Sequence, residues 1–310
     1  MNRGAPIVVG VDGSAPALSA VRWAAREAVL RTRPLHLLSV MPDDADTFGG
    51  AVKLGAPRFP NQQTVGRERL STARSEALLS AATLGDRELQ IVDKLRFGNG
   101  VETLLDESRT AAMLVVGSHG LNQFADAILG SVSAAVVLHS NVPVAVIRNV
   151  PNSKQPQMSG PIVVGIDGTE NSEPAIAEAF ETASLHGVEL TAVHAWSDSD
   201  LTTVFRSDPD GVSLDWDTIS TAEHAVLAER LAGWRQEYPD VAVRCVVVRD
   251  NPARQLEIES KSAQLVLVGR RGRGGFSSML LGSTSRRLMH TASCPLLIMP
   301  SPTRQKDQNT

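Results

Sequence analysis

The sequence predicts an α/β protein made of two tandem doubly wound domains, each a five-stranded parallel sheet flanked by helices. Three observations predict this fold: a long internal repeat, an alternation of short apolar runs with helical segments, and glycine-rich loops after some of those runs. The repeat is visible in PIVVGVDGS (6–14) and PIVVGIDGT (161–169), and again in VVGSHGLNQFADAILGS (115–131) and LVGRRGRGGFSSMLLGS (267–283). Copies of this length indicate a duplicated domain and not a solenoid repeat.

The repeat also sets the predicted domain boundaries. A chain of 310 residues is too long for one compact core and suits two domains of roughly 150 residues. We expect domains over residues 1–148 and 161–300. Between them, residues 149–160 read NVPNSKQPQMSG, a composition that is typical of a linker. Residues 301–310 are polar and are expected to form a frayed tail.

Apolar runs and helical periodicity place the elements of the first half. Ile7–Val11 is a short apolar run, as expected for a strand that is buried on both faces. Ser14 then caps a predicted helix that has Pro16 in its first turn and ends near Leu30, before Pro34. The same alternation predicts strands at 35–40, 88–95, 113–116 and 144–147, and helices at 62–84, 101–108 and 132–139.

The second half repeats this order. Its predicted strands lie near 162–166, 190–195, 241–248, 265–268 and 296–299, with helices between them. Parallel strands linked by crossover helices build a doubly wound sheet. In such sheets a ligand binds outside the carboxyl ends of the strands, where the strand order reverses. The loops at that edge are therefore the predicted functional site.

Two glycine-containing loops per half follow strands at that edge. One is Gly10-Val-Asp-Gly-Ser, with its twin Gly165-Ile-Asp-Gly-Thr; the other has the form Gly-x2-Gly-x9-Gly-Ser and starts at Gly117 and at Gly269. Glycine lets backbone N–H groups approach an anion closely, and the final Gly-Ser opens a helix whose N-terminus favours phosphate. The pattern is neither a P-loop, which needs Gly-Lys-Ser/Thr, nor the dinucleotide-binding fingerprint, which has another spacing.

These motifs resemble the ATP-binding branch of the universal stress protein family. The resemblance covers both halves, and the motif is complete twice, each time in its strand–loop–helix context. The segments HAWSD (194–198), ERLAGW (229–234) and VVVRDNPARQL (246–256) are similar to tandem members from mycobacteria and related actinobacteria. The family fold is a five-stranded parallel sheet whose fifth strand pairs with that of a second domain. The resemblance thus implies pairing between residues 144–147 and 296–299.

Carried over onto this sequence, the resemblance implies a nucleotide site in each half. The aspartates would lie beside the nucleotide, and Val40 and Ala195 would present backbone groups to adenine. The residues implied in the first half are Gly10, Asp12, Val40, Gly117, Ser118, His119, Gly120, Gly130 and Ser131. Those implied in the second half are Gly165, Asp167, Ala195, Gly269, Arg270, Arg271, Gly272, Arg273, Gly282 and Ser283. Two plainer interpretations stay open: the aspartates could only cap Asp-Gly turns, and the loops could be empty structural turns.

The resemblance implies an ATP-binding regulator of the response to stress such as hypoxia, or of growth arrest and dormancy. Any Mg²⁺ would be held mainly by the phosphates of ATP, and no catalytic residue or metal ligand is predicted. The glycine loops contain no lysine and no acidic cluster, so fast turnover is not expected. Two alternatives stay open: a slow ATPase or nucleotidyl-type enzyme, and a nucleotide-free dimerisation scaffold. The protein partners are unknown, and a homodimer is compatible with this function.

Charge distinguishes the two phosphate loops. The second carries Arg270, Arg271 and Arg273, whereas the first has His119 as its one candidate base and adds Asp126. A positive charge beside a phosphate near the surface contributes on the order of a few kcal/mol before desolvation is subtracted. We therefore expect the second half to bind ATP more tightly, unless these arginines face solvent or a neighbouring helix.

Composition excludes several other classes of function. The net charge of −4 gives no reason to expect nucleic acid or an anionic membrane as a partner. No apolar stretch approaches the ~18 residues of a membrane span, and the first residues do not resemble a signal peptide. Cys245 and Cys294 have no metal-ligand spacing, so a reducing cytoplasm suits the chain, with Cys294 as a small buried hydrophobe.

The remaining conspicuous side chains are expected to be structural. His194 follows the pattern of a satisfied core residue, and His139 and His290 end helices, where a cation favours the dipole. The long loops 42–61 and 197–217 could be lids, partner surfaces or disordered insertions. The tryptophans are too scattered for a base-stacking platform and are expected to be packing residues: Trp23, Trp196, Trp216 and Trp234.

Overall fold

The computed structural model describes residues 4–42, 62–85, 87–120, 129–148, 160–196, 216–273 and 280–301, without the side chains of residues 216 and 217. The chain divides into two compact units, Met1–Ser153 and Lys154–Thr310. Some predicted features lie outside the described residues: linker residues 149–159, the tail beyond residue 301, Asp126, the Trp216 side chain, and most of the loops 42–61 and 197–217.

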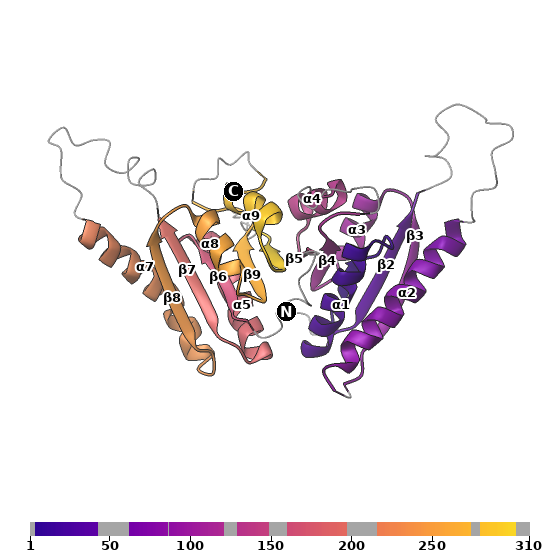
Figure 1. Ribbon diagram of the computed structural model, residues 1–310, viewed down its shortest axis with the longest axis horizontal. Coiled ribbons are helices and arrows are strands. Elements are labelled where there is room, and N and C mark those ends of the chain that lie inside the picture. Colours follow the sequence, from indigo (N-terminus) through magenta and orange to yellow (C-terminus); the bar gives the residue numbers. More distant parts are fainter. Residues whose placement is uncertain are drawn as a thin grey trace, which may run out of the picture. The chain divides into compact units, whose positions relative to one another are not determined.

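The first unit is a five-stranded parallel sheet with helices on both faces (Figure 1). Its strands lie in the order β3-β2-β1-β4-β5, with α1 and α2 on one face and α3 and α4 on the other. The elements are β1 Ile7–Gly10, α1 Ala15–Leu30, β2 Leu35–Met41, α2 Gln62–Ala82, β3 Ile91–Phe97, α3 Gly100–Ser108, β4 Met113–Gly117, α4 Ser131–His139 and β5 Val144–Ile147.

The second unit repeats this topology. Its strands lie in the corresponding order β8-β7-β6-β9-β10, with α5 and α7 on one face and α8 and α9 on the other. The elements are β6 Ile162–Ile166, the 3₁₀ helix η1 Glu170–Ser172, α5 Glu173–His186, β7 Leu190–Trp196, α7 Trp216–Glu237, β8 Val243–Arg249, α8 Pro252–Ser260, β9 Leu265–Gly269, α9 Ser283–Thr291 and β10 Leu296–Met299. The predicted fold class is confirmed.

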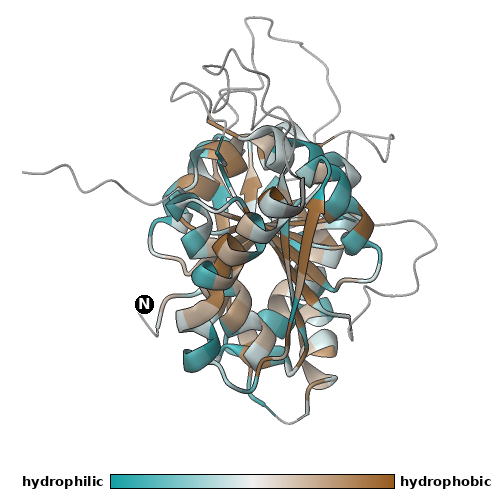
Figure 2. Cartoon of the chain, turned by 90° about the vertical axis from the view of Figure 1, so that its left-hand side faces the viewer, coloured by the Kyte–Doolittle hydropathy of each residue, from teal (hydrophilic) through white to brown (hydrophobic). Residues whose placement is uncertain are grey.

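The apolar residues gather in the strands and on the inner helix faces (Figure 2), because the helices cover both faces of each sheet. Ile7, Val8 and Val9 of β1 have no exposed surface. Ser14 caps α1 as predicted, since its Oγ accepts the Ala17 N–H at 3.3 Å. A buried central strand followed at once by a capped helix leaves a tight turn at the carboxyl end of β1.

The edge strands begin and end later than the sequence predicts. The predicted strand 88–95 is β3 Ile91–Phe97, and the predicted strand 241–248 is β8 Val243–Arg249. Each edge strand pairs with the full length of its neighbour, from Leu35↔Ile91 to Met41↔Phe97 in the first unit. Backbone pairing, which the apolar pattern of a half-exposed strand does not report, therefore sets these boundaries.

The predicted packing roles of the described tryptophans and of His194 hold in the structure. Trp23 and Trp196 are buried. Trp234 donates its Nε1–H to Glu173 at 2.8 Å and stacks on Phe180. His194 is fully buried, and both of its ring nitrogens are within hydrogen-bonding distance of a partner. In the described part of the chain, no helix is both long and apolar enough to cross a membrane.

The two cysteines are expected to react at very different rates. Cys245 is exposed on β8, whereas Cys294 is buried, and burial raises the pKa of its thiol to about 12. Because only the thiolate attacks a disulfide reagent, the folded chain should titrate one thiol quickly at pH 8 and the second at least about a hundredfold more slowly. Cys245→Ser should remove the fast phase. Two equally fast thiols in the folded protein would contradict this expectation.

Candidate functional site

Each glycine loop closes on itself at its base. The Gly130 N–H donates to the Ser118 carbonyl at 2.7 Å, and the Gly282 N–H donates to the Arg270 carbonyl at 2.8 Å. This contact brings the end of the loop back to its beginning at the carboxyl edge of the sheet. The loop interiors, residues 121–128 and 274–279, lie outside the described residues.

Each loop then opens a short helix without a side-chain cap. Gly130 and Gly282 occupy the N-cap positions of α4 and α9, and neither helix has a side-chain hydrogen bond at its cap. Ser131 and Ser283 are the first helical residues. The N–H groups of a first helical turn have no partner within the helix, so this arrangement directs donors toward a ligand.

A second serine anchors each helix to the strand before the loop, and sequence reasoning missed it. Ser133 Oγ donates to the Gly117 carbonyl at 2.7 Å, and Ser285 Oγ donates to the Gly269 carbonyl at 2.7 Å. The signal was present as the repeated pattern Gly-Ser-x-Ser. A Cβ at Gly117 would lie 2.9 Å from the backbone of Pro16, so glycine at this position is required by the start of α1.

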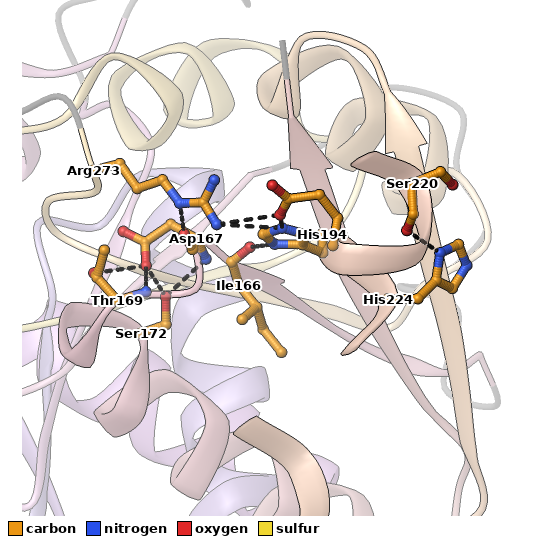
Figure 3. Close-up of polar contacts among 9 residues, drawn as sticks. Ile166, Asp167, Thr169, Ser172, His194, Ser220, His224 and Arg273 are labelled. Atoms are coloured by element: carbon orange, nitrogen blue, oxygen red, sulfur yellow. Dashed lines mark hydrogen bonds and ion pairs between the residues drawn. The ribbon is translucent and has the colours of Figure 1, made fainter. Parts of the chain in front are cut away.

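Asp167 organises the turn after β6 with one carboxylate oxygen. Its Oδ1 accepts from the Thr169 N–H at 2.8 Å, the Thr169 hydroxyl at 2.8 Å and the Ser172 hydroxyl at 2.6 Å (Figure 3). Its Oδ2 is buried and has no hydrogen-bond partner among the described residues. A buried carboxylate oxygen without a partner is costly, so Asp167 Oδ2 is a candidate acceptor for a hydrogen-bond donor of a ligand.

The second glycine of each loop faces the aspartate of the same half. A Cβ at Gly272 would lie 3.2 Å from Asp167 Oδ2, and a Cβ at Gly120 would lie 2.6 Å from Asp12 Oδ2. Asp12 Oδ1 accepts the Ser14 N–H at 2.9 Å. The structure thus brings the predicted aspartate and the predicted loop together in both halves.

Gly10 and Gly165, at the ends of the first strands, make room for protein side chains. A Cβ at Gly165 would lie 2.8 Å from Leu256 Cδ1 of α8, and one at Gly10 would lie 3.3 Å from Leu104 Cδ2 of α3. Their small size is therefore explained by helix packing. Val40 lies near the end of β2, one residue before its last.

A cavity of about 530 Å³ lies at the carboxyl edge of the second sheet. All of the residues predicted for the second half line it, except Arg270. It also has lining residues that the sequence analysis did not name, among them Ser172, Asn251, Leu256, Thr284 and Arg287. Asn251 caps α8, with its Oδ1 accepting from the Ala253 N–H at 3.0 Å, so α8 and α9 both start at this cavity.

The three arginines predicted in the second loop occupy different environments. Arg271 lines the cavity and donates its Nε–H to the Ser301 hydroxyl at 2.9 Å. Arg273 lines the cavity but donates its Nε–H to the Asp167 carbonyl oxygen and forms an ion pair with Glu223 at 3.5 Å. Arg270 lies away from the cavity, where burial and then the charge of Arg271 lower the pKa of its guanidinium.

The cavity chemistry suits a ligand with an anionic end and a hydrogen-bond donor. Arg271, Arg273 and Arg287 supply positive charge, and Asp167 is the one acidic residue among the described residues of the lining. Within the part of the chain that the structure describes, no group of three or more His, Cys, Asp or Glu side chains could hold a metal ion.

Known proteins match both halves of the chain. The model of the Universal stress protein family matches residues 5–148 and 158–300. Universal stress protein Rv2005c of Mycobacterium tuberculosis is 40% identical over 297 residues, covering 94% of this chain and 96% of that protein. Universal stress protein Rv2623 of the same organism is 39% identical over 293 residues, covering 94% and 95%.

A solved structure shares the fold. The crystal structure of a universal stress protein from Archaeoglobus fulgidus aligns with a TM-score of 0.65 at 17% identity, covering 97% of this chain and 98% of that one. The duplicated motif, the strand order of each unit and these matches agree: the chain belongs to the universal stress protein family.

Proposed function

We propose that each half of this chain binds ATP at the carboxyl edge of its sheet and that the chain is a cytoplasmic stress-response regulator. The observation that carries the proposal is the second-half cavity of about 530 Å³, which lies within the ~300–1,000 Å³ typical of small-molecule sites. Residues from β6, β7, α8, the glycine loop and α9 converge on it.

The lining supports one orientation of the nucleotide. Phosphates would lie at the start of α9, against the N–H groups after Gly282 and the Ser283 hydroxyl, where the helix dipole favours negative charge. The adenosine would extend along the cavity toward Ala195 and Leu256. A ribose hydroxyl or the adenine amino group would then supply the donor that Asp167 Oδ2 lacks among the described residues.

The chemistry of the lining favours a regulator over a fast enzyme. Phosphoryl transfer needs a positioned nucleophile and a cation clamp, and Asp167 is the one carboxylate among the described residues that line the cavity. Any Mg²⁺ would be held mainly by phosphate oxygens. Bound ATP would instead order a surface that a protein partner recognises under stress such as hypoxia or during growth arrest.

The chain purified without added nucleotide should release adenine nucleotide when it is denatured. We expect one to two ATP per chain by chromatography of the released small molecules. Mostly ADP would indicate slow hydrolysis. No nucleotide, followed by no binding in an ATP titration, would overturn the proposal and leave a duplicated interaction scaffold.

The same assay should respond to a paired glycine variant. Gly120→Ala places a methyl group 2.6 Å from Asp12 Oδ2, and Gly272→Ala places one 3.2 Å from Asp167 Oδ2. Because these methyl groups would displace both aspartates, the double variant should release at most about a tenth of the wild-type nucleotide. The matched control is Gly233→Ala on α7, where nothing lies within 4 Å of the added carbon.

A further inference from the structure

A cluster of three charged or titratable side chains joins the second glycine loop to α7. Arg273 follows the second glycine of that loop, His194 lies on β7 and Glu223 lies on α7. Arg273 Nη2 lies 3.5 Å from Glu223 Oε2 and 3.3 Å from His194 Nε2. The Arg273 side chain passes over the carboxyl end of β6 to reach these two residues. On the way its Nε–H donates to the Asp167 carbonyl oxygen (Figure 3).

His194 and Glu223 form a closely spaced pair beneath the guanidinium of Arg273. The Ile166 carbonyl can only accept, so the contact at 2.8 Å requires a hydrogen on His194 Nδ1. On the other side of the ring, His194 Nε2 lies 2.6 Å from Glu223 Oε2. The His194 side chain is 0% exposed and that of Glu223 is 17% exposed, so the pair can anchor the guanidinium of Arg273.

Gly168, in the turn after β6, leaves room for the guanidinium of Arg273. Gly168 has φ +77°, and a Cβ there would collide with Arg273 Nη2 and lie 3.1 Å from Val226 of α7. A side chain at Gly168 would therefore displace Arg273 from its anchor. Because Gly272 and Arg273 are adjacent, this contact also holds Gly272 beside Asp167 Oδ2, in the cavity wall.

The first half has no equivalent anchor. The repeat places Ser39 at the position of His194 and Leu121 at the position of Arg273. Ser39 Oγ is buried without a hydrogen-bond partner in the described part of the chain. The anchor is therefore a property of the second half alone.

We propose that Glu223 and His194 are positioning residues of the second nucleotide site: they hold Arg273, and through it Gly272, beside Asp167 before the nucleotide arrives. This inference rests on the proposed function. A loop that is ordered in advance costs less entropy on binding, so the anchor should raise the affinity of the second half. The first half binds without this contribution.

Two measurements on the full chain test the anchor. Glu223→Gln should speed amide hydrogen exchange of the peptide covering 268–273 in nucleotide-free protein and weaken ATP binding at one site by about five- to tenfold. Arg273→Met should have the same effects, and the double variant should lose no more affinity than Arg273→Met alone, because Glu223 acts through Arg273. The control Glu229→Gln removes the same charge from an exposed position on α7 and should change neither measurement.

The outcomes separate this inference from the proposed function. Unchanged exchange, unchanged affinity or additive losses in the double variant would each overturn the positioning role. Tighter ATP binding by Glu223→Gln would also overturn it, since Glu223 would then withhold Arg273 from the ligand. If the wild-type chain binds no ATP, the proposed function and the positioning role fall together, while the exchange measurement still decides whether the anchor orders the loop.

Discussion

Replacing Asp167 with asparagine is expected to weaken adenine-nucleotide binding in the second half by about 10- to 100-fold, because a hydrogen bond to a charged group contributes about 1.5–3 kcal/mol. Three donors, from Thr169 and Ser172, converge on Oδ1. The asparagine oxygen must therefore stay at the Oδ1 position, and its NH₂ group must replace Oδ2. A ligand donor would then meet another donor. The turn itself should keep its hydrogen bonds, so the thermal midpoint should change little.

Calorimetric titration of the full chain with ATP measures this effect. Asp167→Asn should remove or weaken one of two binding events, and Asp12→Asn should do the same to the other. Thr169→Val is the matched control, because it removes a hydroxyl donor to Oδ1 without touching Oδ2. If Asp167→Asn leaves both affinities at the wild-type values, Oδ2 does not contact the nucleotide, and the aspartate only caps its turn.

The fold and the outline of the site could be predicted because the motifs that indicate them occur in both halves of the chain. Two copies of an apolar run followed by Asp-Gly predict buried central strands with a tight turn, and Ser14 at the start of α1 caps it as predicted. The glycine spacing predicts a loop that opens a helix, and both loops do so. These features depend on residues that are close in the sequence, where local rules apply.

The rest depends on packing between distant segments. The contact between Arg273 and Glu223 requires the position of α7, which apolar periodicity does not fix to the level of one side chain. Leu256 explains Gly165 only after α8 is packed on β6. Arg287 lies one helical turn after Ser283, so helical spacing would have placed it on the side of the phosphate loop, and this signal was available.

Among the charged residues, the arginines that line the second cavity are expected to have the largest effect on ATP affinity. Arg271 and Arg287 both line it, whereas the repeat places His119 and Ala135 at these positions of the first half. Each guanidinium has five N–H donors, and the contacts with Ser301 at 2.9 Å and with Glu257 at 3.4 Å engage only part of them. Both therefore keep N–H donors that these two contacts do not engage.

The double variant Arg271→Ala/Arg287→Ala should weaken ATP binding in the second half by about 100-fold, and AMP binding by only a fewfold. Two unit charges about 4 Å apart near a surface interact by roughly 4 kcal/mol before desolvation, and ATP carries more phosphate charge than AMP. The salt dependence of ATP binding should also flatten, because exposed charges are screened. Titrations with ATP and AMP at low and high salt measure both effects.

The reciprocal variant His119→Arg/Ala135→Arg tests the same idea as a gain of affinity. It places the second-half charges on the first half and should tighten ATP binding there while AMP binding changes little. Equal losses of ATP and AMP in Arg271→Ala/Arg287→Ala would mean that the arginines support the loop and do not contact phosphate. No loss of either nucleotide would mean that they face solvent. The difference in loop charge would then not distinguish the ATP affinities of the two halves.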